Sequence, residues 1–281
     1  MLNSNHKPLV SIIIPAYNYA NYIGECLDSV ISQTFKDWEC IIIDNCSTDN
    51  TSEIVKVYAA NDSRIKYYYS DQKGVSLARN LAVKMSSGTY ILPLDADDKI
   101  NSSYITKALA IMEKNPTISL VYCDAILFGS VNKKWILPEF SYREMLIENS
   151  IFSSALYKKS EFLAVNGYNT NMVEGFEDWD FWIKLLADDK KVIKIHELLF
   201  YYRIKDNSRN SLLDHEKQLR LRTQIYNNHL ELYNRYFVIP ELLYSNYKLK
   251  QKYDTLFNSL TYRIGKIAAS PLNFFKKLFN T

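Results

Sequence analysis

The chain has 281 residues, of which 47% are hydrophobic and 23% are charged, and its formal net charge is +3. This length and apolar fraction allow one large domain or two small ones, and they exclude an intrinsically disordered chain and a small disulfide scaffold. The net charge conceals an asymmetry: residues 1–202 carry 20 Lys and Arg against 25 Asp and Glu, whereas residues 203–281 carry 14 against 6. We therefore expect an acidic body and a basic C-terminal region with different roles.

Neither a signal peptide nor a membrane span is indicated. The first apolar run, at residues 9–14, is short and ends at Pro15, and no stretch reaches the roughly 18 to 20 apolar residues of a spanning helix. The four cysteines have no metal-like spacing and lie in or beside apolar runs, which indicates buried free thiols. The sequence thus predicts a cytoplasmic protein.

Short apolar runs alternate with segments of helical periodicity over the first 100 residues. Strands are expected at residues 9–14, 40–43, 65–69 and 90–94, and helices at residues 22–33, 47–60 and 75–85. Strands that are continuously apolar and separated by helices are typical of a parallel sheet covered on both faces. The predicted fold class is therefore α/β, with an open, doubly wound, mostly parallel sheet.

The pattern is less regular beyond residue 100. We expect a helix at 102–115, a strand at 118–123, an irregular region at about 125–150 and a helix at 179–187. Two short strands are then expected at 192–195 and 198–202, and helices from about residue 212 onward, with breaks at Pro240 and Pro271.

Polar residues follow four of the predicted strands, where ligands bind in doubly wound sheets. The first strand is followed by Pro15, Ala16, Tyr17 and Asn18, the second by Asp44 and Asn45, the third by Ser70 and Asp71, and the fourth by Asp95, Ala96, Asp97 and Asp98. Asn and Asp also favour turns and helix caps, so any one of these ends has a structural explanation. Four such polar strand ends at one edge of the sheet indicate a ligand-binding site.

The cluster of Asp95, Asp97 and Asp98 indicates a cation. Adjacent carboxylates repel one another unless a cation or a set of donors offsets them, and Mg²⁺ and Mn²⁺ prefer oxygen ligands. Strand alternation places Asp95 and Asp97 on the same side. We therefore expect a divalent cation that carries a nucleotide diphosphate; capping of the following helix is the alternative. No glycine-rich phosphate loop occurs, which disfavours dinucleotide oxidoreductases and P-loop NTPases.

Together these segments resemble the ordered motifs of the family 2 glycosyltransferases, which are inverting enzymes with the GT-A fold, many of them bacterial polysaccharide enzymes. The resemblance covers about residues 8–205, and its motifs are at residues 10–18, 43–49, 74–80, 94–98 and 177–179. It implies a GT-A domain at 1–205, with a nucleotide-binding half (about 1–100) and an acceptor-binding half (101–205). A helical extension with a basic amphipathic tail follows at 206–281.

The resemblance also assigns roles to residues. It implies that the nucleotide is bound by Pro15, Ala16, Tyr17, Asn18, Asp44, Arg79 and Asp95, and that Asp97 with Asp95 binds the metal. Two further nucleotide-binding candidates, Asn45 and Lys205, stand where the family has other residues. It implies that Asp178 is the catalytic base, next to Glu177; a structural role at a helix N-terminus is the alternative for this pair. Trp179 and Tyr168 are candidates for stacking on the acceptor sugar, although core packing is also open to the aromatic residues of this segment.

The sequence departs from the family pattern in three places. Asn45 stands where a second Asp is common, and Ala82 stands where a Gly is common. Lys205 stands where many members have a His near the metal or the diphosphate. A protonated lysine is not an ordinary metal ligand but can pair with a diphosphate directly, so this change weakens the expectation of a metal.

The tail, residues 256–281, has apolar residues near helical spacing with basic residues between them. Such segments can lie on an anionic membrane surface, which would make the protein peripheral to the cytoplasmic face. Packing against the domain or a dimer contact is the alternative, so a homo-oligomer stays open.

The sequence as a whole predicts an inverting glycosyltransferase. It would transfer a sugar from a nucleotide diphosphate donor, expected to be a UDP-sugar, to a glycan or lipid-linked acceptor in cell-surface polysaccharide synthesis, with no nucleic-acid partner. The alternatives are a non-catalytic nucleotide-sugar-binding assembly subunit and a nucleotidyltransferase. The second of these normally has a glycine-rich basic loop after the first strand, which is missing here.

Overall fold

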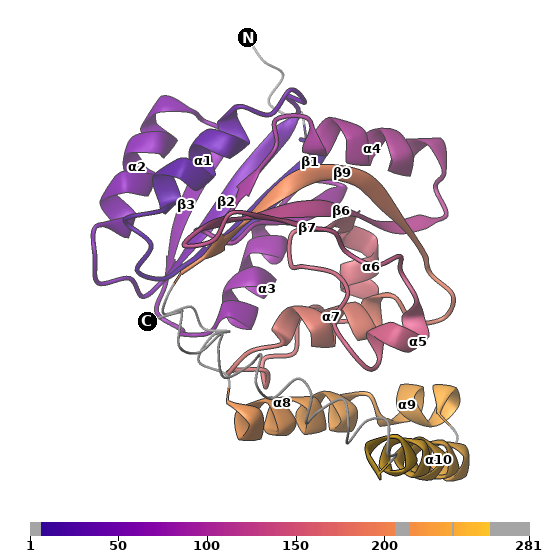
Figure 1. Cartoon of the computed structure of the whole chain (residues 1–281). Helices are drawn as coiled ribbons and strands as arrows, with labels where there is room; N and C mark the ends of the chain where they lie inside the picture. The colour runs from indigo at the N-terminus through magenta and orange to yellow at the C-terminus, as the bar shows by residue number, and fades with distance from the viewer. Residues whose placement is uncertain (1–6, 206–213, 238, 259–281) are drawn as a thin grey trace, which may run out of the picture. The chain divides into compact units, whose positions relative to one another are not determined.

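A computed structural model describes residues 7–205, 214–237 and 239–258 of the chain, without the side chains of 239–243, 254 and 257–258 (Figure 1). The chain divides into two compact units, Met1–His229 and Leu230–Thr281. The first unit contains the sheet and the candidate site, and the second is helical in its described part.

The first unit begins with the predicted alternation of strands and helices. Its elements are β1 (Val10–Ala16), α1 (Ile23–Ile31), β2 (Trp38–Asn45), α2 (Thr51–Asn61), β3 (Ile65–Ser70), α3 (Val75–Met85) and β4 (Tyr90–Pro93). These four strands are parallel and lie in the order β3-β2-β1-β4. Helices α1 and α2 lie on one face of the sheet and α3 on the other (Figure 1). The predicted doubly wound α/β class is confirmed.

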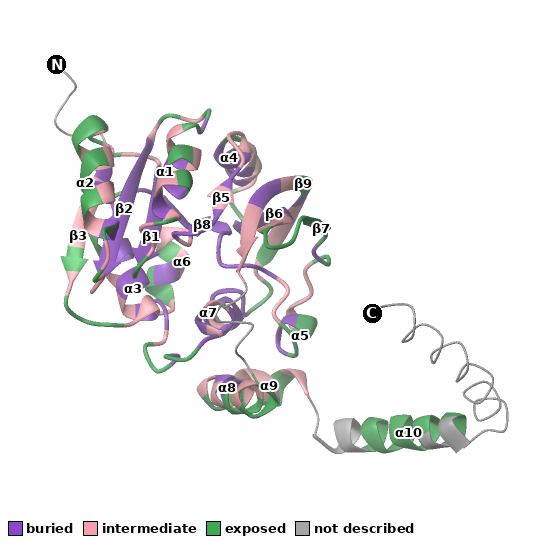
Figure 2. Ribbon diagram, turned by 60° about the vertical axis from the view of Figure 1, so that its left-hand side comes forward, coloured by how far each residue is buried: buried purple, intermediate pink, exposed green. Residues whose placement is uncertain are grey.

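Burial explains why the strands carry continuous apolar runs. Every residue of β1 and β2 is buried, because both strands are central and helices cover both faces of the sheet (Figure 2). The order of strands reverses between β1 and β4, since β2 and β3 continue on one side of β1 and β4 pairs on the other. Ligands bind outside the carboxyl ends of strands at such a switch point.

The second half of the sheet mixes parallel and antiparallel pairs. Its elements are β5 (Lys99–Ile100), α4 (Tyr104–Lys114), β6 (Ile118–Gly129), β7 (Lys133–Trp135), α5 (Tyr142–Met145), β8 (Leu156–Lys158), α6 (Lys159–Ala164), α7 (Glu177–Leu185) and β9 (Lys191–Ile204). Strand β8 is antiparallel to both β4 and β6 and so joins the two halves, whereas β6 and β9 are parallel. The short elements β5, β7, β8, α5 and α6 were not among the predicted ones, because two to six residues are too few to display a hydrophobic period.

Two predictions for this half were wrong in detail. The short strands expected at 192–195 and 198–202 are one strand, β9, in which the pairing partner moves from Ile195 to Leu198 between Cys123 and Asp124 of β6. Such a bulge breaks the alternation that a strand pattern needs. The region at 125–150, expected to be irregular, contains the end of β6 together with β7 and α5.

Helix α8 (His215–Asn228) completes the first unit. It begins after Asp214, whose carboxylate accepts a hydrogen bond from the backbone N–H of Lys217 at 2.7 Å, as an N-cap does. The predicted domain boundary at 205/206 stays a prediction, since residues 206–213 lie outside the described part.

The second unit contains the helices α9 (Leu230–Tyr236) and α10 (Ile239–Asn258), in agreement with the helical pattern expected there. The predicted amphipathic tail begins within α10, but its residues 259–281 lie outside the described part of the chain. No helix within the described ranges has the length and hydropathy to cross a membrane.

Candidate active site

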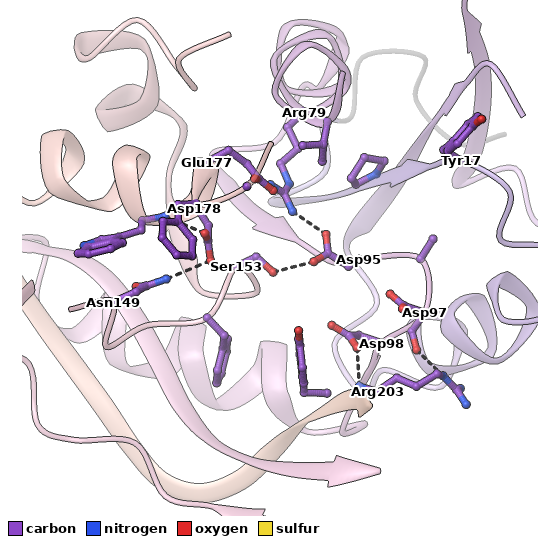
Figure 3. A pocket seen from close by; sticks show the side chains of 18 of the residues that line it. Tyr17, Arg79, Asp95, Asp97, Asp98, Asn149, Ser153, Glu177, Asp178 and Arg203 are labelled. Carbon is purple, nitrogen blue, oxygen red and sulfur yellow. Dashed lines mark hydrogen bonds and ion pairs between the residues drawn. The ribbon is translucent and has the colours of Figure 1, made fainter. Parts of the chain in front are cut away.

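A cavity of about 970 Å³ lies in the first unit, at the carboxyl ends of β1 and β4 and beside the start of α7 (Figure 3). Of the predicted site residues, it is lined by Pro15, Ala16, Tyr17, Asn45, Arg79, Asp95, Asp97, Glu177, Asp178, Trp179 and Lys205. Segments that are far apart in the sequence therefore meet at the switch point of the sheet. Three predicted residues, Asn18, Asp44 and Tyr168, are not part of this lining.

Asn45 supports the rim of the cavity. Its side-chain N–H donates to the carbonyl of Gln72, and its Oδ1 accepts a hydrogen bond from the backbone N–H of Gly74 at 2.7 Å. Gly74 has a φ of +146°, which side chains rarely adopt, and it precedes α3. The amide thus fixes the turn that starts the helix carrying Arg79.

Asn18 and Asp44 stabilise the loops that follow β1 and β2. Asp44 is 1% exposed; its two carboxylate oxygens accept hydrogen bonds from the backbone N–H of Ser47 at 2.9 Å and from the Tyr67 hydroxyl at 2.7 Å. Asn18 accepts a hydrogen bond from the backbone N–H of Thr48 at 2.7 Å. Both side chains are thus engaged in loop contacts, and their roles in nucleotide binding stay predictions.

Arg79 is the centre of the polar network in the cavity. Its side chain is 2% exposed; Nη2 lies 2.6 Å from Oδ1 of Asp95, and Nη1 lies 3.0 Å from Oε1 of Glu177 (Figure 3). The two carboxylates raise the pKa of Arg79, against the opposing effect of burial. A single buried guanidinium therefore joins the D-x-D segment after β4 to the start of α7.

The ring of Tyr168 packs near the guanidinium of Arg79. Its ring centroid lies 5.4 Å from the Arg79 guanidinium and 4.1 Å from the ring of Phe181, and the residue is 2% exposed. The expectation that Tyr168 offers a face to an acceptor sugar is therefore not met by its position. Trp179 does line the cavity, but it is also 2% exposed, and its indole N–H donates to the carbonyl of Met145 at 2.6 Å.

Each carboxylate of the Asp cluster after β4 has a partner from another segment. The second oxygen of Asp95 accepts a hydrogen bond from the Ser153 hydroxyl at 3.1 Å. Oδ2 of Asp97 lies 2.5 Å from Nζ of Lys205, and Asp98 accepts a hydrogen bond from the backbone N–H of Arg203 at 2.8 Å. Burial raises the pKa of Asp97, and burial together with the neighbouring carboxylates raises the pKa of Asp98.

Glu177 and Asp178 begin α7, as predicted. Oδ1 of Asp178 accepts a hydrogen bond from the backbone N–H of Trp179 at 2.8 Å, and Oδ2 accepts one from the side chain of Asn149 at 3.2 Å. Burial, and next the charge of Glu177, raises the pKa of Asp178 to about 6. Asp178 therefore has the position in the cavity and the proton affinity expected of a general base near neutral pH.

The sequence did not point to Asn149, Ser153 or Arg203. Asn149 and Ser153 come from the segment between α5 and β8, which carries no motif and reaches the cavity only through the fold. Arg203 is the second-last residue of β9, and its guanidinium stacks over the rings of Phe128 and Tyr22 at 4.3 and 4.9 Å.

The donor set does not fit a divalent cation held jointly by Asp95 and Asp97. Asp95 pairs with Arg79 and Asp97 with Lys205, so each carboxylate already forms an ion pair with a basic side chain of the protein. Within residues 7–205, 214–237 and 239–258, no group of three or more His, Cys, Asp or Glu residues is arranged to hold a metal ion. Hard cations take several oxygen ligands, and the paired carboxylates of Asp95 and Asp97 do not offer them.

The family model for glycosyl transferase family 2 matches residues 11–171. The putative teichuronic acid biosynthesis glycosyltransferase TuaG of Bacillus subtilis is 32% identical over 214 residues, which are 74% of this chain and 84% of TuaG. The hyaluronan synthase of Pasteurella multocida is 30% identical over 94% of this chain, but the chain spans only 26% of that protein.

Two solved structures share the fold. The S. aureus protein TarS 1–349 in complex with UDP-GlcNAc superposes with a TM-score of 0.67 at 21% identity, over 79% of this chain and 66% of that one. The mannosyltransferase PcManGT from Pyrobaculum calidifontis, in complex with GDP-Man and Mn²⁺, gives 0.59 at 18% identity, over 97% of this chain and 89% of that one.

Proposed function

The chain belongs to glycosyl transferase family 2 and is a glycosyltransferase, and on this premise we propose what it transfers and how. The donor is a nucleotide diphosphate sugar, specifically a UDP-sugar, and the acceptor is a hydroxyl of a glycan or of a lipid-linked saccharide in cell-surface polysaccharide synthesis. The names of TuaG and of the hyaluronan synthase support the pathway, and the nucleotide sugar in each solved neighbour supports the donor class.

One observation carries the proposal: a carboxylate with a pKa raised to about 6 lies in the same cavity as the residues after β1 and β4. In the reaction, Asp178 accepts the proton of the acceptor hydroxyl while the hydroxyl oxygen attacks the anomeric carbon. The bond from that carbon to the diphosphate oxygen breaks, and the nucleoside diphosphate leaves with the electron pair. Attack opposite the leaving group inverts the anomeric configuration.

The surrounding residues position these groups. Asn149 orients the Asp178 carboxylate, and Arg79 neutralises Glu177, so that a second negative charge beside the base is compensated. Pro15, Ala16, Tyr17 and Asn45 line the cavity at the ends of β1 and β2, where the nucleotide is expected. Asp95 faces the ribose in this proposal, held by Arg79 and Ser153.

A thermal-shift screen of UDP- and GDP-sugars, each with Mn²⁺ and with EDTA, tests the donor class, because a ligand that binds the native state raises the melting temperature. We expect UDP-sugars to give the largest shifts. Larger shifts with GDP-sugars would overturn the uridine assignment, and no shift with any nucleotide sugar would overturn the donor class.

The variant Asp178→Asn tests the base. Release of nucleoside diphosphate from the donor identified in the screen should fall at least a hundredfold, whereas donor affinity should stay within about threefold. Asp189→Asn makes the same chemical change at an exposed turn beyond α7 and serves as the matched control. Tight donor binding by the wild-type chain without any turnover would favour a non-catalytic assembly subunit instead.

The cytoplasmic location, the contact of the tail with an anionic membrane and a homo-oligomeric state also belong to this proposal. Deleting residues 265–281 should release the protein from anionic vesicles and leave nucleotide binding unchanged. Equal vesicle binding by the full chain and the truncated chain would contradict the membrane contact.

A further inference from the structure

Two of the three carboxylates after β4 pair with cations that the chain itself supplies, and the third accepts a backbone hydrogen bond. Asp95 pairs with Arg79 at 2.6 Å and Asp97 pairs with Lys205 at 2.5 Å. Asp98 accepts a hydrogen bond from the backbone of Arg203, whose Nε also donates to the carbonyl of Asp97 at 2.8 Å. The charges of Asp95 and Asp97 are thus compensated by side chains of the protein itself.

The guanidinium groups of Arg79 and Arg203 both form ion pairs with carboxylates of the protein. Arg79 is buried between two carboxylates. Nη2 of Arg203 lies 3.1 Å from a carboxylate oxygen of Glu25, and its guanidinium lies over two aromatic rings. Both side chains are at most 11% exposed. Neither is in a position to exchange its partners for a ligand at low cost.

Lys205 is held differently. Its Nζ lies 4.7 Å from the centroid of the Tyr19 ring and 5.1 Å from that of Tyr22, so aromatic contacts position the ammonium group. Its side chain is 26% exposed and lines the cavity. An ammonium group has three donors, and the polar partner that the described residues give it is the single carboxylate of Asp97. It can therefore bind an anion in the cavity while its ring contacts stay in place.

We propose that Lys205 binds the diphosphate of the donor directly and supplies the positive charge for which enzymes of this fold generally use a divalent cation. Nucleotide binding by this chain would then be independent of a metal. The inference rests on the proposed function, because the ligand is the nucleoside diphosphate of that reaction. As the anomeric bond breaks, negative charge grows on the leaving oxygen, and a preorganised ammonium group stabilises that charge.

The test is the binding of UDP and of GDP to the full chain by isothermal titration calorimetry, in EDTA and in Mn²⁺. The wild-type chain should bind the better of the two nucleotides with dissociation constants that agree within threefold in the two buffers. Lys205→Met keeps the aliphatic stem but removes the charge, and it should weaken binding in EDTA at least tenfold. Lys107→Met, at a lysine of α4 that is 38% exposed and pairs with Glu197 outside the cavity, is the control.

Two further variants distinguish a loss of the Lys205 charge from a loss of folding. Lys205→Arg keeps the charge and should retain binding within about fivefold in EDTA. Lys205→His places a metal-binding side chain beside Asp97, and its binding should become at least tenfold stronger in Mn²⁺ than in EDTA. Melting curves of all variants identify any that do not fold.

The outcomes separate this inference from the proposed function. Wild-type binding that is tenfold weaker in EDTA than in Mn²⁺, or equal binding by the wild type and Lys205→Met in EDTA, overturns the role of Lys205. Metal-independent nucleotide binding without sugar transfer supports the role of Lys205 in binding the diphosphate and contradicts the proposed transfer reaction. Failure of both nucleotides to bind in either buffer overturns the donor class and this inference with it.

Discussion

Nη2 of Arg79, on α3, lies 2.6 Å from Oδ1 of Asp95, in the segment that follows β4. The same guanidinium reaches Glu177 at the start of α7. A residue expected from the family resemblance to contact the nucleotide is thus a structural bridge between the two acidic motifs of the cavity. This position makes Arg79 important for stability as well as for the site.

Replacing Arg79 with Leu should strongly destabilise the protein. The change leaves Asp95 and Glu177 without their common cation, and breaking a buried ion pair on one side costs about 3 kcal/mol or more. The free energy of unfolding from urea denaturation measures the effect. Arg220→Leu removes an arginine that is 58% exposed and pairs at the surface; it should cost less than about 1 kcal/mol. Equal losses in the two variants would contradict the bridge.

The rate of transfer should depend on the protonation of Asp178. Its pKa is raised to about 6, and a general base acts in its unprotonated form. The kcat/KM for donor turnover should therefore rise tenfold per pH unit below about pH 6 and level off above it. A rate that is flat between pH 5 and pH 8 would argue against Asp178 as the base.

Asp178→Asn should make the folded protein more stable at neutral pH. The pKa of Asp178 is higher in the folded state than its usual 3.8, so its contribution to stability is full below about pH 4 and is lost as the pH rises through 6. At pH 7.5 the variant should gain about 3 kcal/mol, and this gain should disappear near pH 4. Urea denaturation at the two pH values measures the difference; a variant less stable than wild type at pH 7.5 would contradict the direction of the pKa shift.

Asn149→Ala should move the acidic limb of the pH profile upward. The Asn149 side chain donates to Oδ2 of Asp178, and a donor to a carboxylate favours its charged form. We expect the apparent pKa in kcat/KM to rise by about half a unit, and by more than that in Asn149→Asp, which adds a negative charge. Asn61→Ala, at an exposed position on α2, should leave the profile in place. A profile unchanged in both Asn149 variants would show that Asn149 does not act on the base.

Gly88→Ala should disrupt the packing of β1. An added Cβ would lie 2.5 Å from Oγ and 2.6 Å from the backbone N of Ser11, so the buried strand itself would have to move. A loss of about 2–3 kcal/mol is expected, as in overpacked cores. The control is Gly24→Ala on α1, where the added Cβ meets only the Tyr58 hydroxyl at 3.4 Å and where alanine is the better helix former by up to about 1 kcal/mol. Comparable destabilisation at the two glycines would refute the steric argument.

The first half of the fold was predictable because its signals are local. The runs at residues 9–14 and 40–43 are apolar at consecutive positions, and they form β1 and β2, buried on both faces. The second half of the fold was less predictable, because β8 has only three residues and β9 is interrupted by a bulge. A period cannot be recognised in three residues, and a bulge shifts the alternation on which recognition depends.

The residues of the candidate site also differ in how far the sequence reveals them. The place of Asp95 and Asp97 after a predicted strand made them candidates, and the family resemblance added Glu177 and Asp178. Asn149 and Ser153 could not be found in this way, since their segment has no periodicity and no motif. Tyr168 was expected at the acceptor surface, but it is buried and its ring packs near the Arg79 guanidinium. The sequence does not reveal whether an aromatic side chain faces a cavity or the interior.

The sequence is enough to predict the alternation of strands and helices, the α/β class, the family resemblance and the acidic residues at the edge of the sheet. Hydrophobic periodicity and residue type are local properties, and the chain carries them in any conformation. The partners of those acidic residues depend on the tertiary structure. Lys205 reaches Asp97, and Arg79 reaches Glu177, across about 100 residues of sequence. An ion pair forms between side chains a few ångströms apart, and only the fold sets that distance.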